Sequence, residues 1–297
     1  MKVFDRYSCK SQGVNHILNL QPSPALTLLI LSPPLLTTNN SYGPEGAGKT
    51  LMTEIVASEV NAMVIKLSST SIGNAFEGGD DATRLIHMIF TVAKDQSLSP
   101  VIIYLDQCHE FFTGKSKKKS CSGSPDTAIN ESTMKRFQES LLIYKNQFLT
   151  KQDRVLVIGC TNTPDAADMK LMRWKGPSEK PEKQGFFEHS LYFPNLSQCS
   201  RALLWREALR RKMNGTSSEC HLDFNLLALL SDGCSAKKIL EVIDEMFSSQ
   251  VSKPLSEACF ASKLESMTSQ REHKDEHQPF VDFRRQWENN GVGKDVK

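Results

Sequence analysis

The sequence lacks an excess of charge of either sign, because 36 lysines and arginines face 34 aspartates and glutamates in its 297 residues. A balanced charge gives no electrostatic reason to expect nucleic acid or a membrane surface as the main partner, and we expect neither. With 39% hydrophobic residues, the chain is also unlike the strongly charged, weakly apolar chains that stay disordered. Its length suffices for one large or two modest globular domains.

Cysteine motifs and long apolar runs are missing as well. The eight cysteines form no CxxC pair and no cluster with histidine at zinc-ligand spacing, so we interpret them as reduced thiols of an intracellular protein. The most apolar early segment, Ala25–Leu36, is too short to cross a bilayer and is interrupted by Pro33 and Pro34. It begins late and lacks a small-residue cleavage site, which argues against a secretory signal.

Two kinds of pattern alternate from about Tyr42 onward. Strands are predicted at 62–67, 101–105 and 155–158, and helices at 50–60, 81–94 and 131–148. Such alternation predicts an α/β layer with a parallel sheet. After Pro194 the strand patterns stop, and helices are predicted at 197–213, 224–230 and 235–249. This change of composition indicates a domain boundary.

A glycine-rich loop, GPEGAGKT, is the strongest motif. It fits GxxxxGK[ST] and opens a predicted helix, which is the context that a phosphate-binding loop requires. Glycines let successive backbone N–H groups turn around phosphate oxygens, and the helix N-terminus adds its positive end. We expect Lys49 to reach the β and γ phosphates and the Thr50 hydroxyl to bind Mg²⁺. The predicted nucleotide-binding residues are Gly43, Pro44, Glu45, Gly46, Ala47, Gly48, Lys49 and Thr50. The alternative is a glycine loop without a ligand.

The segment before this loop departs from the usual pattern. Thr37–Tyr42 is polar, whereas the strand that leads into such a loop is normally apolar and buried. Two alternatives remain: Leu35 and Leu36 begin a weak strand, or the authentic first strand is missing from this chain. The first 38 residues show no clear period and receive no assignment.

An acidic residue ends the apolar run VIIYL at Val101–Leu105. Asp106 is placed where ligands bind in parallel sheets and can hold Mg²⁺ through water; alternatively, it caps the next segment. Gln107 follows. A glutamate at this position could polarise an attacking water, but an amide of the same shape cannot accept that proton. Glu110 can substitute only if the chain turns helically after Gln107; otherwise it is a solvated glutamate.

A second buried strand, Val155–Ile158, leads to a polar end that includes Asn162. An asparagine there can hydrogen-bond both a water and a γ-phosphate oxygen, which suits a sensor of nucleotide state. The alternative is that Asn162–Pro164 is merely a turn. We therefore expect Asp106, Gln107 and Asn162 to form the catalytic part of the site.

The order of these motifs, followed by SDGCSAKKI at Ser231–Ile239, resembles the AAA family of ATPases over about Tyr42–Gln250. Further details resemble one branch, the IQ motif and AAA domain-containing proteins, which are the AAA subunit of the nexin-dynein regulatory complex of cilia. These details are Thr83–Phe90 (TRLIHMIF), Asp153–Gly159 (DRVLVIG), Leu191–Pro194 (LYFP), Leu203–Glu207 (LLWRE) and the degenerate Gln107. The resemblance implies ATP and Mg²⁺ as cofactors, Thr50 and Asp106 as metal ligands, Asn162 as the first sensor, and protein partners in a ciliary complex or a homo-oligomer. It also makes Phe76–Gly78 similar to a pore loop, although Phe76 fits a plain core position equally well.

The chain departs from the family pattern in two further places. Gly185–Glu188 contains no arginine, although active AAA rings carry there an arginine that completes the neighbouring site; Arg173 is the nearest remaining candidate. An arginine finger is worth about 10³ to 10⁵ in kcat in other NTPases. No IQ motif is present, so calmodulin binding is not carried over. The basic loop at 115–119 is interpreted as solvated.

These observations predict a P-loop AAA-type α/β subdomain at 39–196, a helical lid subdomain at 197–262 and a polar tail at 263–297, after the unassigned residues 1–38. We expect an ATP-binding component of an axonemal dynein-regulatory assembly with weak or absent hydrolysis. The alternative is an active AAA ATPase that remodels a protein partner. A small-molecule kinase shares the loop, but the polar sensor strand and the SDGCSAKKI segment argue against it.

Overall fold

The computed structural model describes residues 4–5, 36–69, 72, 79–112, 131–150, 153–173, 175, 185–213, 222–248, 256–268 and 278–289. Within these residues, the central element is a six-stranded sheet in the order β1-β3-β4-β5-β2-β6. Its strands are β1 (Phe4–Asp5), β2 (Leu36–Tyr42), β3 (Met63–Ser68), β4 (Val101–Asp106), β5 (Val155–Thr161) and β6 (His189–Tyr192). All neighbouring pairs are parallel except β1 with β3. The predicted α/β class is confirmed.

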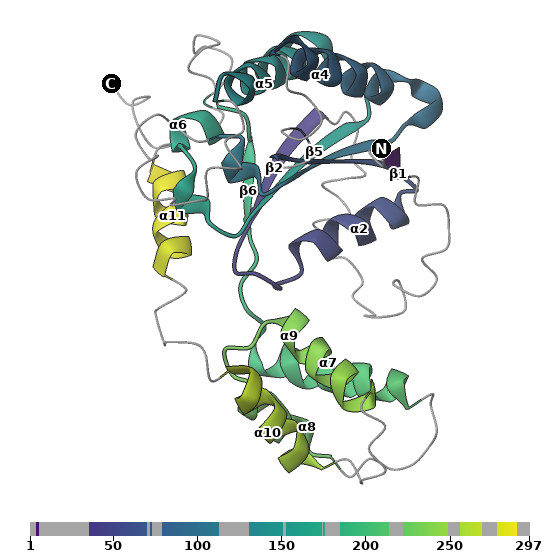
Figure 1. Cartoon of the computed structure of the whole chain (residues 1–297), viewed down its shortest axis with the longest axis vertical. Coiled ribbons are helices and arrows are strands. Elements are labelled where there is room, and N and C mark those ends of the chain that lie inside the picture. The colour runs from purple at the N-terminus through teal and green to yellow at the C-terminus, as the bar shows by residue number, and fades with distance from the viewer. Residues whose placement is uncertain are drawn as a thin grey trace.

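Helices cover both faces of this sheet, as Figure 1 shows, with α4 and α5 on one face and α2 on the other. They are α2 (Lys49–Glu59), α4 (Gly79–Lys94) and α5 (Glu131–Ile143), which continues as a π-helical turn at Tyr144–Phe148. The larger apolar core lies against α4 and α5 and includes Phe90, Phe112 and Phe137. A smaller core lies against α2 and includes Val56, Ile102 and Tyr104.

Strand β2 is the unexpected element of the sheet, because it is polar and yet lies between β5 and β6. Thr38 and Asn40 are fully buried. The Thr38 hydroxyl donates to the Phe186 carbonyl at 2.8 Å, and the Cys108 thiol donates to Asn40 Oδ1 at 3.3 Å. Hydrogen bonding lowers the cost of burying these two side chains, although Asn40 Nδ2 has no hydrogen-bond partner among the described residues. Of the two alternatives for this segment, the structure therefore has the strand, which begins at Leu36.

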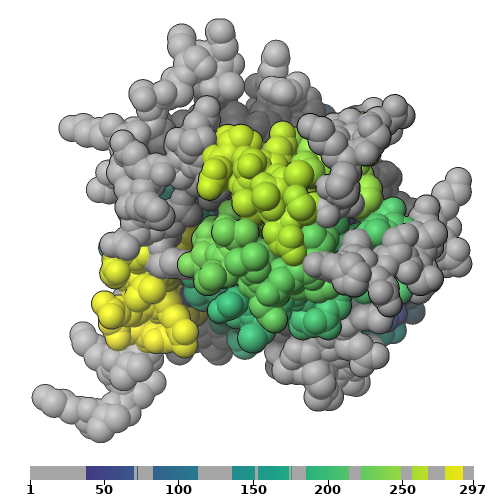
Figure 2. Space-filling view, turned by 90° about the horizontal axis from the view of Figure 1, so that it is seen from below, coloured from purple at the N-terminus to yellow at the C-terminus, as the bar shows by residue number. Residues whose placement is uncertain are grey.

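A second group of helices follows β6 and has a core of its own around Trp205 and Phe260, whose rings lie 5.3 Å apart. We call α7–α10 the lid helices: α7 (Gln198–Lys212), α8 (Phe224–Leu230), α9 (Ala236–Ser248) and α10 (Glu257–Thr268). Two of them begin at a side-chain cap typical of helix starts: Ser197 and Asp223 accept backbone N–H groups of α7 and α8. Figure 2 shows the lid helices on one face of the molecule, with α11 beside them.

The last helix among the described residues, α11 (Gln278–Asn289), packs against the sheet, and its residues are not part of the lid core. Phe280 and Phe283 are buried in a cluster with Tyr42, and the Tyr42 and Phe283 rings lie 4.7 Å apart. The remaining short elements are 3-10 turns at Gln96–Leu98, Cys108–Glu110 and Pro164–Ala166, and α6 (Met169–Met172).

The predicted helices and strands agree with the structure, most to within two residues at each end, and the polar end of β5 runs three residues further than predicted. The division of the chain near residues 196 and 262 remains a proposal, and α10 runs through the second of these positions. Part of the predicted polar tail is the packed helix α11. No helix among the described residues has the length and apolar character needed to cross a bilayer.

Candidate nucleotide-binding site

The glycine-rich loop connects β2 to α2, as the motif requires. Its backbone is left-handed at Gly46 (φ 76°) and Gly48 (φ 96°), a conformation that side chains disfavour. The loop is anchored at its start, because the Gly43 N–H donates to the Thr161 carbonyl of β5 at 3.3 Å. A Cβ at Gly43 would lie 2.1 Å from the Phe193 carbonyl oxygen, so the chain approaches too closely for any other residue.

Lys49 is enclosed by the loop that precedes it. Its side chain is 7% exposed, and Nζ donates to the carbonyl oxygens of Gly43 and Pro44, at 2.7 Å each. Burial lowers the pKa of Lys49 below its usual value, while the nearby Cys160, Glu45 and Asp106 act in the opposite direction. The loop therefore holds an amine at the N-terminus of α2, where a helix end already favours anions.

Thr50 and Asp106 come together at the carboxyl edge of the sheet through a third residue. The hydroxyl groups of Thr50 and Tyr104 lie 2.9 Å apart, and the Tyr104 hydroxyl donates to Asp106 Oδ1 at 3.4 Å. Tyr104 precedes Asp106 by two residues, so both side chains lie on the same face of β4. The two predicted metal ligands thus share one hydrogen-bonding partner.

Gln107 and Glu110 follow Asp106 in a tight turn. Gln107 is exposed and left-handed (φ 48°), and its N–H donates to Asp106 Oδ1 at 3.0 Å. The 3-10 turn at Cys108–Glu110 then directs Glu110 back toward the sheet, where its carboxylate accepts the Ser69 hydroxyl. Burial and the charge of Asp106 raise the pKa of Glu110. The helical turn that the Glu110 alternative requires is therefore present.

Asn162 directly follows β5 at the same edge of the sheet and is partly exposed. Its neighbour Thr161 is buried, and Thr161 Oγ1 lies 2.9 Å from His109 Nδ1. Burial lowers the pKa of His109, with Asp165 and Asp106 acting in the opposite direction. This arrangement brings the ends of β4 and β5 together and places Asn162 beside Asp106's strand, as expected from their parallel pairing.

The lid touches the loop directly at Gly46. A Cβ at Gly46 would lie 2.6 Å from Ser235 Oγ and 2.8 Å from Lys237 Cβ, and the Lys237 N–H donates to the Gly46 carbonyl at 3.3 Å. Lys237 Nζ lies 3.5 Å from Glu45 Oε1. The start of α9, within the SDGCSAKKI segment, therefore packs on the phosphate loop. The lid helices and the sheet are in direct contact at this point.

Gly185–Glu188, the segment that contains no arginine, contributes two side chains to the larger hydrophobic core. Phe186 and Phe187 are fully buried, and Lys145 Nζ donates to the Phe186 carbonyl at 2.6 Å. The Arg173 guanidinium lies over the Trp287 ring of α11, 5.9 Å from its centroid. Its Nη1 is buried and has no hydrogen-bond partner in the described part of the chain.

The residues at this edge fit a nucleotide with a magnesium ion. The loop offers backbone N–H groups, left-handed glycines and an enclosed amine, while Thr50 and Asp106 offer oxygen atoms that both contact the Tyr104 hydroxyl. Two protein oxygens are a donor set that suits Mg²⁺, which is usually held by one or two carboxylates together with substrate phosphates and water.

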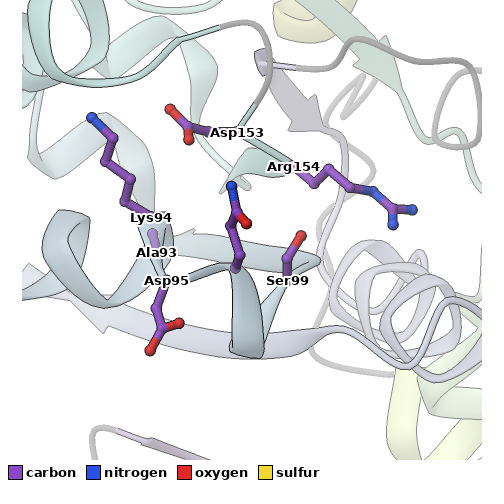
Figure 3. Close-up of a pocket in the computed structure, with 7 residues that line it drawn as sticks. Ala93, Lys94, Asp95, Ser99, Asp153 and Arg154 are labelled. Atoms are coloured by element: carbon purple, nitrogen blue, oxygen red, sulfur yellow. The ribbon is translucent and has the colours of Figure 1, made fainter.

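A shallow pocket of about 280 Å³ lies at the opposite, amino-terminal edge of the strands. Figure 3 shows Lys94, Asp95, Asp153 and Arg154 around it. Its carboxylates are already satisfied locally, because Asp95 accepts from Ser97 and Asp153 accepts from Thr150. We therefore locate the candidate site at the loop and not at this pocket.

Residues 41–179 match the model of the ATPase family associated with various cellular activities (AAA). This segment of the chain is similar to an AAA domain. An AAA-type segment of this kind implies a nucleotide-binding site that works with a metal ion.

Two curated relatives are similar over most of the chain. The proteasome-activating nucleotidase of Methanothermobacter thermautotrophicus is 28% identical over 204 residues, which are 69% of this chain and 43% of that protein. Dynein regulatory complex protein 11 of Mus musculus is 23% identical over 244 residues, 79% of this chain and 26% of that protein. This chain thus spans less than half the length of these relatives. The crystal structure of the FIGL-1 AAA domain in complex with ADP has a TM-score of 0.58 at 19% identity, over 98% of this chain and 89% of that chain, which shows the fold.

Several contributors to the site were not predicted from the sequence. Tyr104 could have been found from the period of two along β4, but Ser69, His109, Ser235 and Lys237 come from segments whose positions only the fold reveals. The predicted pore-loop residues Phe76–Gly78 and the basic loop at 115–119 lie outside the described residues.

Proposed function

We propose that this AAA domain binds ATP with Mg²⁺ between the carboxyl edge of the sheet and the lid. We further propose that bound nucleotide holds these two parts together, and that the protein is a nucleotide-stabilised component of a dynein-regulatory assembly in the axoneme, with weak or absent hydrolysis. Its partners are then other proteins of that complex.

The contact between the loop and the lid at Gly46 carries the binding part of this proposal. Because Ser235 and Lys237 already lie against the loop, a phosphate held there is close to both groups of elements. A ligand that binds only the folded state stabilises it by RT ln(1 + [L]/Kd), about 2.7 kcal/mol at 100 times Kd. We therefore expect bound nucleotide to stabilise the folded arrangement of the sheet and the lid.

Gln107 and the arginine-free segment Gly185–Glu188 support weak hydrolysis. Loss of general-base assistance alone typically costs about 10² to 10⁴ in rate. The axonemal part of the proposal has a separate support, namely the similarity to Dynein regulatory complex protein 11 over 79% of this chain.

An active ATPase that remodels a partner is the second candidate. It is favoured by the shared location of Lys49, Thr50, Asp106 and Asn162, by Glu110 with its raised pKa beside Asp106, and by the similarity to proteasome-activating nucleotidases. This candidate requires self-assembly, and because Gly185–Glu188 contains no arginine, Arg173 of a neighbouring copy is the residue left to complete the site.

ATP binding and phosphate release by the purified chain distinguish the two candidates. The first predicts that MgATP raises the melting temperature, while phosphate release equals that of Lys49→Ala. Release that Lys49→Ala abolishes, together with concentration-dependent oligomers, would establish the second. The axonemal role is tested independently by the position of the tagged full-length protein in ciliated cells; exclusion from the axoneme would refute it whatever the nucleotide result.

A further inference from the structure

Tyr104 is surrounded by apolar side chains, and such a position is usually occupied by an apolar residue. It is 2% exposed and packs in the cluster against α2, whose members include Val56, Val64 and Ile158. A phenylalanine would fill the same space. The hydroxyl is the additional feature, and a buried hydroxyl is costly unless it is hydrogen-bonded.

The hydroxyl lies at the meeting point of three elements. It is 2.9 Å from Thr50 Oγ1 at the start of α2 and 3.4 Å from Asp106 Oδ1 at the end of β4, and Tyr104 packs in the same buried cluster as Cys160 of β5. A tyrosine hydroxyl has one proton to donate and accepts as well. It can therefore accept from Thr50 and donate to Asp106 at the same time.

We propose that Tyr104 is a positioning residue for Mg²⁺ in this chain, because its hydroxyl sets the spacing and orientation of the Thr50 and Asp106 oxygens. The inference rests on the proposed nucleotide site and adds a residue to it. Mg²⁺ demands near-ideal octahedral geometry, so ligands that are held in advance bind it with less rearrangement. Outer-shell partners of metal ligands typically contribute 10- to 100-fold in metal affinity.

Tyr104→Phe tests this role, since it removes only the hydroxyl. ATP binding is measured by calorimetry while MgCl₂ is titrated from an EDTA-buffered start. We expect the half-saturating MgCl₂ concentration to rise by about 10-fold or more, while ATP affinity in EDTA stays unchanged. Tyr144→Phe is the matched control, because it removes another hydrogen-bonded tyrosine hydroxyl, 2.9 Å from His87 Nδ1 on the α5 side of the sheet.

Two results would overturn the inference: an unchanged MgCl₂ midpoint, or equal weakening of ATP binding in EDTA and in MgCl₂, which indicates general damage. A double-mutant cycle with Thr50→Val provides a second readout. If Tyr104 acts through Thr50, the effect of Tyr104→Phe on the midpoint shrinks in the Thr50→Val background; full additivity would contradict the proposal. Failure of the wild type to bind ATP at all would refute the proposed site itself.

Discussion

Two parts of the candidate site differ in how closely they match what their proposed role requires. We call Lys49, Thr50 and Asp106 the binding half, and Gln107 with Gly185–Glu188 the hydrolysing half. In the binding half, Lys49, Thr50 and Asp106 each have a hydrogen-bonding partner that fixes their place at the sheet edge. In the hydrolysing half, Gln107 is exposed in a left-handed turn, and Gly185–Glu188 contributes core aromatics in place of an arginine. The difference teaches that a phosphate-binding loop can retain its complete motif in a chain that lacks the glutamate and the arginine expected to accelerate hydrolysis.

Lys49→Ala tests the binding half and has the largest expected effect. Removing one partner of a buried charged hydrogen bond costs about 2 to 5 kcal/mol, which is tens- to thousands-fold in Kd. ATP affinity measured by calorimetry should fall by this factor. Lys66→Ala is the control, because Lys66 pairs with Glu54 on the surface, and it should leave the affinity unchanged. If Lys49→Ala and wild type bind ATP with equal affinity, the proposal that this loop binds the ATP phosphates is wrong.

Gln107→Glu tests the hydrolysing half. A carboxylate at this position supplies the missing proton acceptor, and phosphate release should rise by about 10²-fold with ATP affinity unchanged. If wild type already releases phosphate, Glu110→Gln should reduce that release, since burial and the nearby charge of Asp106 raise the pKa of Glu110 and make it a better proton acceptor. No gain from Gln107→Glu would show that the missing arginine, and not the missing carboxylate, limits the rate.

Gly46→Ala sharpens the comparison at the lid, with Gly48→Ala as a matched control. Both glycines are left-handed, which costs a substituted residue about 1 to 2 kcal/mol. Only Gly46 faces the lid, because nothing lies within 4 Å of a Cβ at Gly48. Chemical denaturation without nucleotide should therefore show a larger loss of unfolding free energy for Gly46→Ala. Identical losses would mean that the loop and the lid do not stabilise each other.

His109 gives the smallest effect, a dependence of stability on pH. Its pKa is lowered by burial, so folding favours the neutral imidazole. The stabilising contribution is then fully present above the unfolded pKa of about 6.5 and is lost as pH falls through the lower folded value. The melting temperature of wild type should decrease more steeply below about pH 6.5 than that of His109→Gln. Parallel pH profiles of the two proteins would contradict this.

Local patterns explain which parts of this molecule were predictable. The loop Gly43–Thr50 and the strand end at Asp106 carry their information within a few residues, and their places in the structure agree with the prediction. Whether Thr37–Tyr42 forms a buried strand could not be predicted from its sequence. Its polar side chains are buried with hydrogen-bond partners from distant segments, such as the Phe186 carbonyl. The contact of Lys237 with Gly46 likewise depends on the path of the chain between the two groups of helices.

The packing of α11 has a practical meaning for anyone who shortens this protein. Phe280 and Phe283 cover Tyr42, the residue immediately before the phosphate loop, and Tyr192 of β6. A version that ends after α10 leaves these two tyrosine rings open to water beside a ligand site, and uncovered aromatic surface of this kind promotes self-association. Aggregation of such a shortened version would then reflect a lost cover, and it would say nothing about how the intact chain assembles.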